Sequence, residues 1–375
     1  MIKPIKMIDL EAEYQLHQEA FEHATQQVFK SGNYIQGPAV KSFEQNLAQY
    51  LNVKHVISCG NGTDALQIAL MALGIKPGDE VIIPAFSYIA VAEVVCLLGA
   101  TPVFVDVDLS YFQLAIESVK KAITVKTKVI IPVHLFGQSA YLEELLILAK
   151  ENNIKIIEDC AQAMGGQYQI NNQFQSLGTF GDIGCTSFFP TKNLSCFGDG
   201  GAIFTNDDEL AIKIRMIANH GQQEKYNHHL VGVNSRLDTV QSAVLAVKLN
   251  FLDQNIAHKR IISERYQEKL KDLTHISLPK VYQASNHSWH QFTILIKDNW
   301  RDELKKHLKT KEIDSMIYYP MPLNHQLAYQ NRDVKTENAL ILSKSVLSLP
   351  IHPLLVTKDI DYICEQIIEF FNAKS

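Results

Sequence analysis

The sequence lacks the features that mark nucleic-acid-binding and membrane proteins. The 375 residues carry a formal net charge of -5, with no basic run interleaved with aromatic residues. Electrostatics therefore give no reason to expect a nucleic acid or an anionic membrane as partner. No apolar run is long enough to span a bilayer, and the start, MIKPIKMIDLEAEY, lacks the long apolar core of a signal peptide. We expect neither a membrane segment nor a secreted protein.

Cysteine is scarce and has no spacing typical of a metal site. There is no CxxC pair and no closely spaced Cys/His set, so the common zinc motifs are excluded and we expect no metal. Most of the cysteines lie in apolar segments, as reduced, buried thiols of a cytoplasmic protein do. The six are Cys59, Cys96, Cys160, Cys185, Cys196 and Cys364.

What the sequence does contain is an alternation of short β-branched runs and longer helical patterns. Several runs are apolar on both faces, as expected for strands covered by helices on both sides. Helix-length patterns lie between the earlier runs, at 64–73, 87–98 and 142–152. The candidate strands are HVISCG (55–60), EVIIPA (80–85), PVFVDV (102–107), KVIIPVHLF (128–136), KIIEDC (155–160), GCTSFF (184–189) and GAIFTN (201–206).

This alternation predicts an α/β fold with a mostly parallel, seven-stranded sheet between helices. After residue 206 the pattern changes, which indicates a second, smaller α+β domain. We expect a large domain over residues 1–245 and a C-terminal domain over residues 246–375. The later elements are a long helical stretch (236–272), a β pattern (292–296) and helices at 301–309 and 360–371.

Ligands of open α/β sheets bind at the carboxyl ends of the strands, so the residues after each run are informative. Gly62 and Thr63 begin a helix, whose free N–H groups suit an anion, although by themselves they fit a plain helix cap better. Asp159 ends an apolar strand, where a carboxylate needs a cation, in either a structural salt bridge or a ligand. Tyr88 is either ordinary core or a flat surface for a ring.

Lys192 lies between the apolar run SFFP and the glycine-rich segment GDGGAIF. A lone lysine is usually solvated, but confinement here would lower its pKa and make its amine nucleophilic toward carbonyls. Together the four features describe one ligand: a phosphate at a helix start, a ring on Tyr88, a cationic ring nitrogen facing Asp159, and an aldehyde condensed with Lys192. That ligand is pyridoxal 5'-phosphate.

Six segments carry a more specific signal: NGTDAL, PAFSYIAVAEV, IIEDCAQ, TSFFPTKNL, GDGGAIFTND and VNSRLDTVQ, in this order. This ordered set resembles the DegT-type (DegT/DnrJ/EryC/StrS) nucleotide-sugar aminotransferases, pyridoxal-phosphate enzymes of fold type I. The resemblance continues in MIYYPMPLN and LPIHP. It implies amino transfer to a keto sugar attached to a nucleotide, by a homodimer whose active sites use both chains. Some relatives carry histidine in place of the lysine and deoxygenate sugars, so Lys192 implies amino transfer.

The resemblance also implies a role for each matching residue. Lys192 binds the cofactor aldehyde and then moves the proton, and Asp159 keeps the pyridine nitrogen protonated. Gln162 contacts the 3-hydroxyl of the ring, and Tyr88 stacks on the ring. The phosphate contacts are Gly62, Thr63 and Ser187, with Asn234 reaching the phosphate from the second subunit.

The substrate is the least specific inference. The segment 219–239 most resembles aminotransferases that use glutamate to aminate C3 of UDP-2-acetamido-2-deoxy-3-oxo-glucuronic acid, in the synthesis of O-antigen and other surface polysaccharides. A uronate needs a cation, and the planar fork of Arg236 can bind both oxygens. His220 and Tyr319 are further candidate substrate contacts. Arg236 could instead bind the glutamate carboxylate, face the diphosphate or face solvent. The rival substrate is a dTDP-linked 3-keto-6-deoxyhexose.

Two other classes of protein compete with the aminotransferase. One is a regulatory module that binds the cofactor without turnover, against which the joint presence of Lys192, Asp159 and the glycine-rich loop argues. The other is a nicotinamide-dependent sugar enzyme, against which the missing GxGxxG after the first strand argues.

Overall fold

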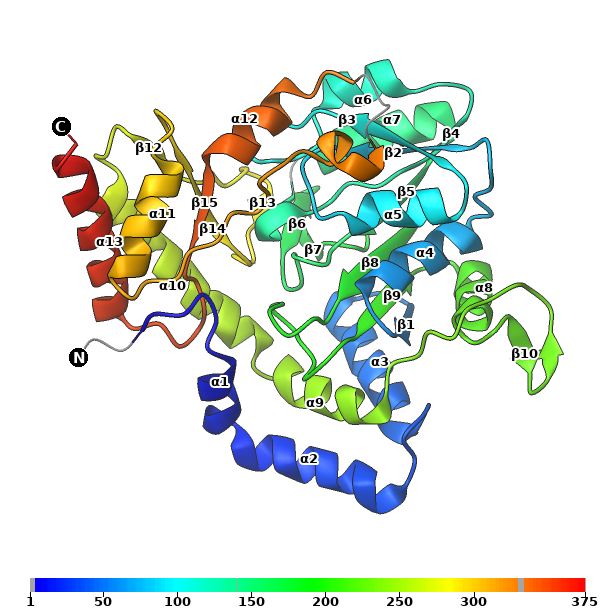
Figure 1. Ribbon diagram of the computed structural model, residues 1–375. Helices are drawn as coiled ribbons and strands as arrows, with labels where there is room; N and C mark the ends of the chain where they lie inside the picture. The colour runs from blue at the N-terminus through cyan, green and yellow to red at the C-terminus, as the bar shows by residue number, and fades with distance from the viewer. Residues whose placement is uncertain (1–3, 140, 330–333, 375) are drawn as a thin grey trace.

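A seven-stranded sheet lies at the centre of the computed structural model, which describes residues 4–139, 141–329 and 334–374 (Figure 1). Its strand order is β1-β9-β8-β5-β4-β2-β3. The pairs β8–β5, β5–β4, β4–β2 and β2–β3 are parallel, and β9 runs antiparallel to both of its neighbours. The prediction of a mostly parallel α/β sheet is confirmed. The strands are β1 (His55–Cys59), β2 (Glu80–Pro84), β3 (Thr101–Val105), β4 (Thr127–Ile130), β5 (Lys155–Asp159), β8 (Ile183–Ser187) and β9 (Gly201–Thr205).

Helices cover both faces of this sheet, which explains why its strands are apolar on both sides. Ile82 packs into one core with helices α6 and α7, whereas its neighbours Val81 and Ile83 pack into another with α4, α5 and α8. A third core lies between α3 and the β1–β9 edge. These helices are α3 (Pro38–Leu51), α4 (Gly62–Ala72), α5 (Ala90–Leu97), α6 (Ile116–Ala122), α7 (Leu142–Asn152) and α8 (Asp208–Ala218).

A separate hydrophobic core forms around a three-stranded antiparallel sheet of order β12-β14-β15. Tyr266, Phe292 and Ile363 are buried in this core, and Ile5 from the start of the chain joins them. Leu323 and Leu342, in contrast, pack into the core of the large sheet. The division of the chain at residue 245 remains a prediction. The elements of this part are β12 (Ile276–Ser277), β14 (Phe292–Ile296), β15 (Val346–Leu349), α10 (Leu252–Leu270), α11 (Arg301–Thr310), α12 (Glu337–Ser345) and α13 (Thr357–Asn372).

Two expectations from the sequence need correction. The helical stretch 236–272 is two helices, α9 (Thr239–Leu249) and α10, because the chain leaves α9 in a tight turn in which the Phe251 N–H donates to the Lys248 carbonyl. The strand expected over 128–136 ends at Ile130, shortly before Pro132, which has no N–H to donate to a ladder. A short 3-10 turn, Leu135–Gly137, follows it.

Several elements were not predicted. Helices α1 (Leu10–Leu16) and α2 (Gln18–Ser31) lie beside α9 (Figure 1). Small ribbons form from β6 (Gln167–Ile170), β7 (Gln173–Ser176) and β13 (Ser285–Asn286), and from β10 (Gln222–Glu224) and β11 (Asn227–His228). None of the helices in the described parts of the chain combines the length and the apolar character needed to span a bilayer.

Candidate active site

The first group of predicted residues lies where β5 meets the loop that follows β8. Asp159, the last residue of β5, is 7% exposed, and its Oδ1 accepts a hydrogen bond from the Ala161 N–H at 2.9 Å. Lys192 is partly buried in the loop, where its backbone N–H donates to the Phe189 carbonyl at 2.9 Å. The side chains of Asp159 and Lys192 are close enough for their charges to act on each other.

Burial changes the acid–base behaviour of both groups. It lowers the pKa of Lys192 from 10.5 to about 8, and the Asp159 carboxylate opposes this shift. Burial also raises the pKa of Asp159, while the Ala161 N–H and the Lys192 charge oppose that rise. An amine with a pKa of about 8 has a useful neutral fraction near neutral pH. It can therefore act as a nucleophile or as a base.

Gln162 and two tyrosines form a second group beside the first. The Gln162 Oε1 accepts the Phe136 N–H at 2.8 Å, and its Nε2 donates to the Tyr319 hydroxyl at 2.9 Å. The Tyr319 ring lies 6.3 Å from that of Tyr88, which is 56% exposed. An open aromatic face thus stands next to a fixed amide and a phenol.

The start of α4 and the end of β8 form a third group, the anion cradle, made of Gly62, Thr63 and Ser187. A Cβ on Gly62 would lie 2.6 Å from the Ser187 Cβ, so glycine is required for this approach. The cap of α4 is Asn61, whose side chain accepts the Asp64 N–H at 2.8 Å. The N–H groups of Gly62 and Thr63 find no acceptor within residues 4–139, 141–329 and 334–374. Free donors at a helix start and two hydroxyls suit an anion.

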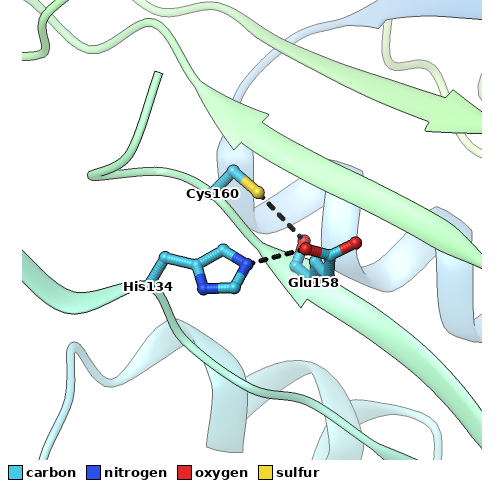
Figure 2. A group of neighbouring side chains, drawn as sticks. All are labelled: His134, Glu158 and Cys160. Atoms are coloured by element: carbon cyan, nitrogen blue, oxygen red, sulfur yellow. Dashed lines mark hydrogen bonds and ion pairs between the residues drawn. The ribbon is translucent and has the colours of Figure 1, made fainter. Parts of the chain in front are cut away.

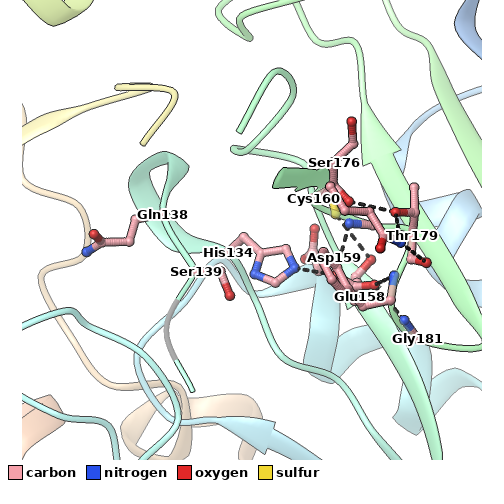
Figure 3. Close-up of polar contacts among 12 residues, drawn as sticks. His134, Gln138, Ser139, Glu158, Asp159, Cys160, Ser176, Thr179 and Gly181 are labelled. Atoms are coloured by element: carbon pink, nitrogen blue, oxygen red, sulfur yellow. Dashed lines mark hydrogen bonds and ion pairs between the residues drawn. The ribbon is translucent and has the colours of Figure 1, made fainter. Parts of the chain in front are cut away.

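Glu158, next to Asp159 on β5, anchors the strand end (Figures 2 and 3). Its buried carboxylate accepts three backbone N–H groups of residues 178–181 at 2.7–2.9 Å and lies 2.8 Å from the His134 Nε2. Burial alone would raise the pKa of Glu158, but the His134 ring and the backbone donors outweigh it and lower the pKa. An ionised Glu158 therefore ties β5 to two loops and fixes where Asp159 emerges.

The same corner also offers three potential metal ligands. The ligand atoms of His134, Glu158 and Cys160 lie within 4.8 Å of one another (Figure 2). Both Glu158 oxygens are already engaged by the four contacts described above. Burial raises the pKa of the Cys160 thiol well above its usual value, which disfavours the thiolate a metal would need. The donor chemistry fits a structural anchor better than a metal site.

The remaining predicted residues form a separate group on the segment after α8. His220 and Asn234 are exposed, and Asn234 pairs with Asn219 in an isolated β-bridge. The Asn219 Oδ1 in turn accepts a hydrogen bond from the Arg236 Nη1 at 3.3 Å. Nothing in the described parts of the single chain brings these three residues into contact with Lys192 or Asp159.

The sequence interpretation missed Glu158, Asn193 and Lys259. Lys259 is 6% exposed, and its Nζ donates to the Asn193 Oδ1 at 2.8 Å. The signal for Glu158 was a second carboxylate on an apolar strand. The signal for Lys259 was its position in the buried stripe of α10, between Ile256 and Ile262.

The three groups fit pyridoxal 5'-phosphate. The anion cradle suits its phosphate, and the open face of Tyr88 suits its ring. Asp159 is a buried carboxylate placed to meet a cationic ring nitrogen, and Lys192 offers an amine of lowered pKa to an aldehyde. Gln162 is held by hydrogen bonds on both ends of its amide, which fixes it beside this space.

Comparison with known proteins agrees with this fit. The model of the DegT/DnrJ/EryC1/StrS aminotransferase family matches residues 15–368. The UDP-2-acetamido-2-deoxy-3-oxo-D-glucuronate aminotransferase of Pseudomonas aeruginosa is 44% identical, over 96% of this chain and 98% of that protein. The dTDP-3-amino-3,4,6-trideoxy-alpha-D-glucose transaminase of Streptomyces venezuelae is 39% identical, over 94% and 92%. The structure of NtdA from Bacillus subtilis with bound cofactor PMP superposes with a TM-score of 0.91 at 29% identity, covering 98% of this chain and 85% of that one.

The chain belongs to the DegT/DnrJ/EryC1/StrS aminotransferase family. It is an aminotransferase, and its cofactor is pyridoxal 5'-phosphate. This confirms the predicted family, fold type and cofactor, and it removes the nicotinamide-dependent enzyme from consideration.

Proposed function

We propose that Lys192 and Asp159 are the catalytic residues of this aminotransferase. Lys192 would hold the cofactor aldehyde, and its amine would then carry the proton between the cofactor and the sugar carbon. Asp159 would hold the pyridine nitrogen in its protonated form, which lets the ring withdraw charge from the reacting carbon. The observation that supports these roles is the pair itself: a lysine with a pKa of about 8 facing a buried carboxylate.

The other cofactor contacts follow from the same arrangement. The anion cradle of Gly62, Thr63 and Ser187 would bind the phosphate. Tyr88 would stack on the ring, and Gln162 would contact the 3-hydroxyl while its amide stays bonded to Tyr319 and to the Phe136 N–H. Tyr319, held at this place, would also touch the sugar.

We propose that the amino acceptor is a UDP-linked 2-acetamido-2-deoxy-3-oxo-glucuronic acid, aminated at C3. The 44% identity to the Pseudomonas aeruginosa enzyme of that name, over nearly the whole of both chains, supports this choice. The main rival is a dTDP-linked 3-keto-6-deoxyhexose, since a transaminase of a dTDP-linked 3-amino sugar is 39% identical. The two sugars differ at C6, where one carries a carboxylate and the other a methyl group.

Arg236 is the proposed ligand of that carboxylate. Arg236 lines a cavity of about 390 Å³ with Lys41, Arg215 and Glu44, of which Arg215 and Glu44 form an ion pair. Within the described residues the side-chain partner of Arg236 is the neutral amide of Asn219 and not a carboxylate. Its planar donors are thus available for a bidentate anion, with His220 nearby on the same segment. The amino donor would be glutamate, and Arg236 could bind its carboxylate in the other half-reaction.

We further propose a homodimer in which Asn234, Arg236 and His220 serve the active site of the partner subunit. Their separation from Lys192 within one chain, and the exposure of Tyr226 and Val231 on the same segment at 82% and 86%, support this. The enzyme would act in the cytoplasm, where its cysteines stay reduced thiols, and would supply an amino sugar for surface polysaccharides such as lipopolysaccharide O-antigen.

The test is amino transfer from glutamate to each of the two sugars, with the purified holoenzyme and matched concentrations. We expect a higher kcat/KM for the UDP-linked uronate. Arg236→Lys should lower this value and leave that of the 6-deoxy sugar nearly unchanged, because lysine keeps the charge but loses the bidentate geometry. Preference of the wild type for the 6-deoxy sugar rejects the uronate, whatever the variant does.

A further inference from the structure

The segment that follows Lys192 is held by two buried lysines from neighbouring helices. Lys259 on α10 donates from Nζ to the Asn193 Oδ1 at 2.8 Å, and Lys248 on α9 donates to the Ser195 Oγ at 2.8 Å. Each lysine is 6% exposed. Burying an ammonium is unfavourable unless an opposite charge or hydrogen-bond acceptors compensate for the lost water. Both buried lysines therefore call for an explanation.

The two lysines differ in how their charge is balanced. The Lys248 ammonium lies 2.9 Å from the Glu13 carboxylate of α1 and 4.9 Å from the centre of the Phe197 ring. Lys259 has no carboxylate at ion-pair distance in the described parts of the chain, and Glu13 acts on it only through space. Lys248 is thus an ordinary buried ion pair. The Lys259 ammonium instead donates a hydrogen bond to Asn193, the residue next to Lys192.

Asn193 is fixed at both ends of its amide. Its Nδ2 donates to the Ser288 carbonyl at 3.0 Å and to the Met164 carbonyl at 3.3 Å, while its Oδ1 accepts from Lys259. A rotated amide would point its oxygen at two carbonyls and its NH₂ at an ammonium. One orientation is therefore strongly favoured, and the main chain beside Lys192 is joined through it to three other segments.

Among the described residues, no carboxylate around this corner forms an ion pair with Lys259, although Glu13 acts on its charge through space. His290 feels the charges of both Lys192 and Lys259, and burial together with these charges keeps its pKa well below the usual value. His352 and Asp9 line a small cavity shared by the two lysines, where burial lowers the pKa of His352 to about 4. On the far side Lys192 faces Asp159. The corner thus combines imidazoles of lowered pKa, two amines and one hydrogen-bonded amide with the carboxylates of Asp9 and Glu13, which line the same cavity.

We infer that Lys259 is a positioning residue of the reaction. From α10 it holds the side chain of Asn193, and through Asn193 it holds the main chain that aims the Lys192 amine at the cofactor space beside Asp159. This role does not depend on which sugar the enzyme uses. It requires that loss of the Lys259 ammonium and loss of the Asn193 amide have the same consequence for Lys192, because they act through one contact.

The variants Lys259→Met, Asn193→Ala and the double variant test this role. Lys213→Met is the matched control, since Lys213 is a half-buried lysine of α8 that donates to the Ala72 carbonyl, away from Lys192. Apoprotein is mixed with pyridoxal 5'-phosphate, samples are reduced with borohydride at intervals, and the fraction of Lys192 carrying the cofactor is counted by peptide mass. The kcat and the sugar KM are measured on the holoenzyme.

We expect capture of the cofactor by Lys192 to slow about tenfold or more in each single variant, since a misplaced reacting group loses at least this much. The double variant should be no slower than either single one. The kcat should fall in parallel, with the sugar KM within about twofold of the wild type. The control should match the wild type. Should Lys259→Met fail to fold, Asn193→Ala carries the test alone.

A folded Lys259→Met protein that captures the cofactor at the wild-type rate would overturn the inference. So would additive losses in the double variant, because they would place the two residues on independent routes. A loss of thermal stability with an unchanged rate of capture would likewise reject it and leave Lys259 a purely structural residue.

Discussion

Single residues set the chemistry of this protein through burial more than through direct pairing. Lys192 and Lys259 each have a pKa lowered to about 8 by burial, while Asp159 has its pKa raised by the same cause. Glu158, one residue from Asp159, keeps a lowered pKa because His134 and backbone donors surround it. The adjacent carboxylates of Glu158 and Asp159 thus have pKa values shifted in opposite directions. Glu158 anchors the strand, and Asp159 suits a cationic ligand.

Lys192→Ala should abolish amino transfer and leave the fold intact. The change removes both the attachment point of the cofactor and the proton carrier, so turnover should fall by about a thousandfold or more. Amino transfer from glutamate measures the loss, and far-ultraviolet circular dichroism checks the fold. Turnover within about tenfold of the wild type would contradict the assignment of Lys192.

Asp159→Asn should slow turnover without unfolding the protein, because the amide keeps the shape but not the charge. The loss of a preorganised electrostatic partner should raise the barrier by about 3 kcal/mol, or about a hundredfold in kcat. Asp108→Asn serves as control, since the Asp108 carboxylate accepts backbone N–H groups of the turn after β3, away from Lys192. If Asp159→Asn turns over at a near-normal rate, the carboxylate does not serve a cationic ring nitrogen.

The pH dependence of stability should reveal the buried charge of Lys259. Its pKa falls from 10.5 in the unfolded chain to about 8 in the folded one. The cost of burying the ammonium is therefore complete below pH 8 and disappears as pH rises toward 10.5. Lys259→Met avoids this cost. The free energy of unfolding of the variant minus that of the wild type should therefore be largest below pH 8 and should fall between pH 8 and 10.5. Urea unfolding of both apoproteins across this range measures the difference, and a flat difference would show that Lys259 titrates normally.

At the scale of elements, the sequence contained enough to predict the central sheet and the residues at its strand ends. Short β-branched runs located all seven strands, and the residues that follow these runs, together with the family motifs, singled out Lys192, Asp159 and the anion cradle. Helix α10 shows where this approach fails. From the sequence alone, Lys259 in the buried stripe of α10 cannot be distinguished from a solvated lysine. Only the packed structure shows that Asn193 accepts its hydrogen bond. The break between α9 and α10 was missed because Asn250 and Phe251 carry no strong stop signal.

The close packing of α4 on β8 gives a test at this scale. Gly62→Ala would place a Cβ at 2.6 Å from the Ser187 Cβ, so the helix start must move away from the strand end. We expect affinity for pyridoxal 5'-phosphate to fall about tenfold or more, since the helix N–H groups would leave the position that suits a phosphate. Gly198→Ala is the control, because a Cβ on Gly198 would meet a side-chain atom, the Gln241 Nε2, at the longer distance of 3.0 Å. Fluorescence titration of both apoproteins measures the affinity. Equal affinities of Gly62→Ala and Gly198→Ala would show that the phosphate does not bind in this cradle.

At the scale of the whole molecule, the proposed site residues form two sets, joined within one chain by Ser235, whose Oγ accepts from the Gly60 N–H and donates to the Asp64 carboxylate at the start of α4. Lys192, Asp159 and the anion cradle lie at the carboxyl ends of the parallel strands, whereas Asn234, Arg236 and His220 lie on the segment after α8. The β10–β11 ribbon of that segment extends away from the rest of the chain (Figure 1). In a twofold dimer each chain would offer both sets to its partner, and a shared site would need one of each.

Mixing two inactive variants distinguishes shared sites from self-contained ones. One variant is Lys192→Ala, and the other carries Asn234→Ala with Arg236→Ala. In a mixed dimer with shared sites, one site receives both defects and the other receives neither. Random exchange makes half of the dimers mixed, so about a quarter of the wild-type activity should return. Subunit exchange is verified by native mass spectrometry, because absence of exchange would also give no activity. Mixed dimers that form and remain inactive would show that Asn234 and Arg236 serve the site of their own chain.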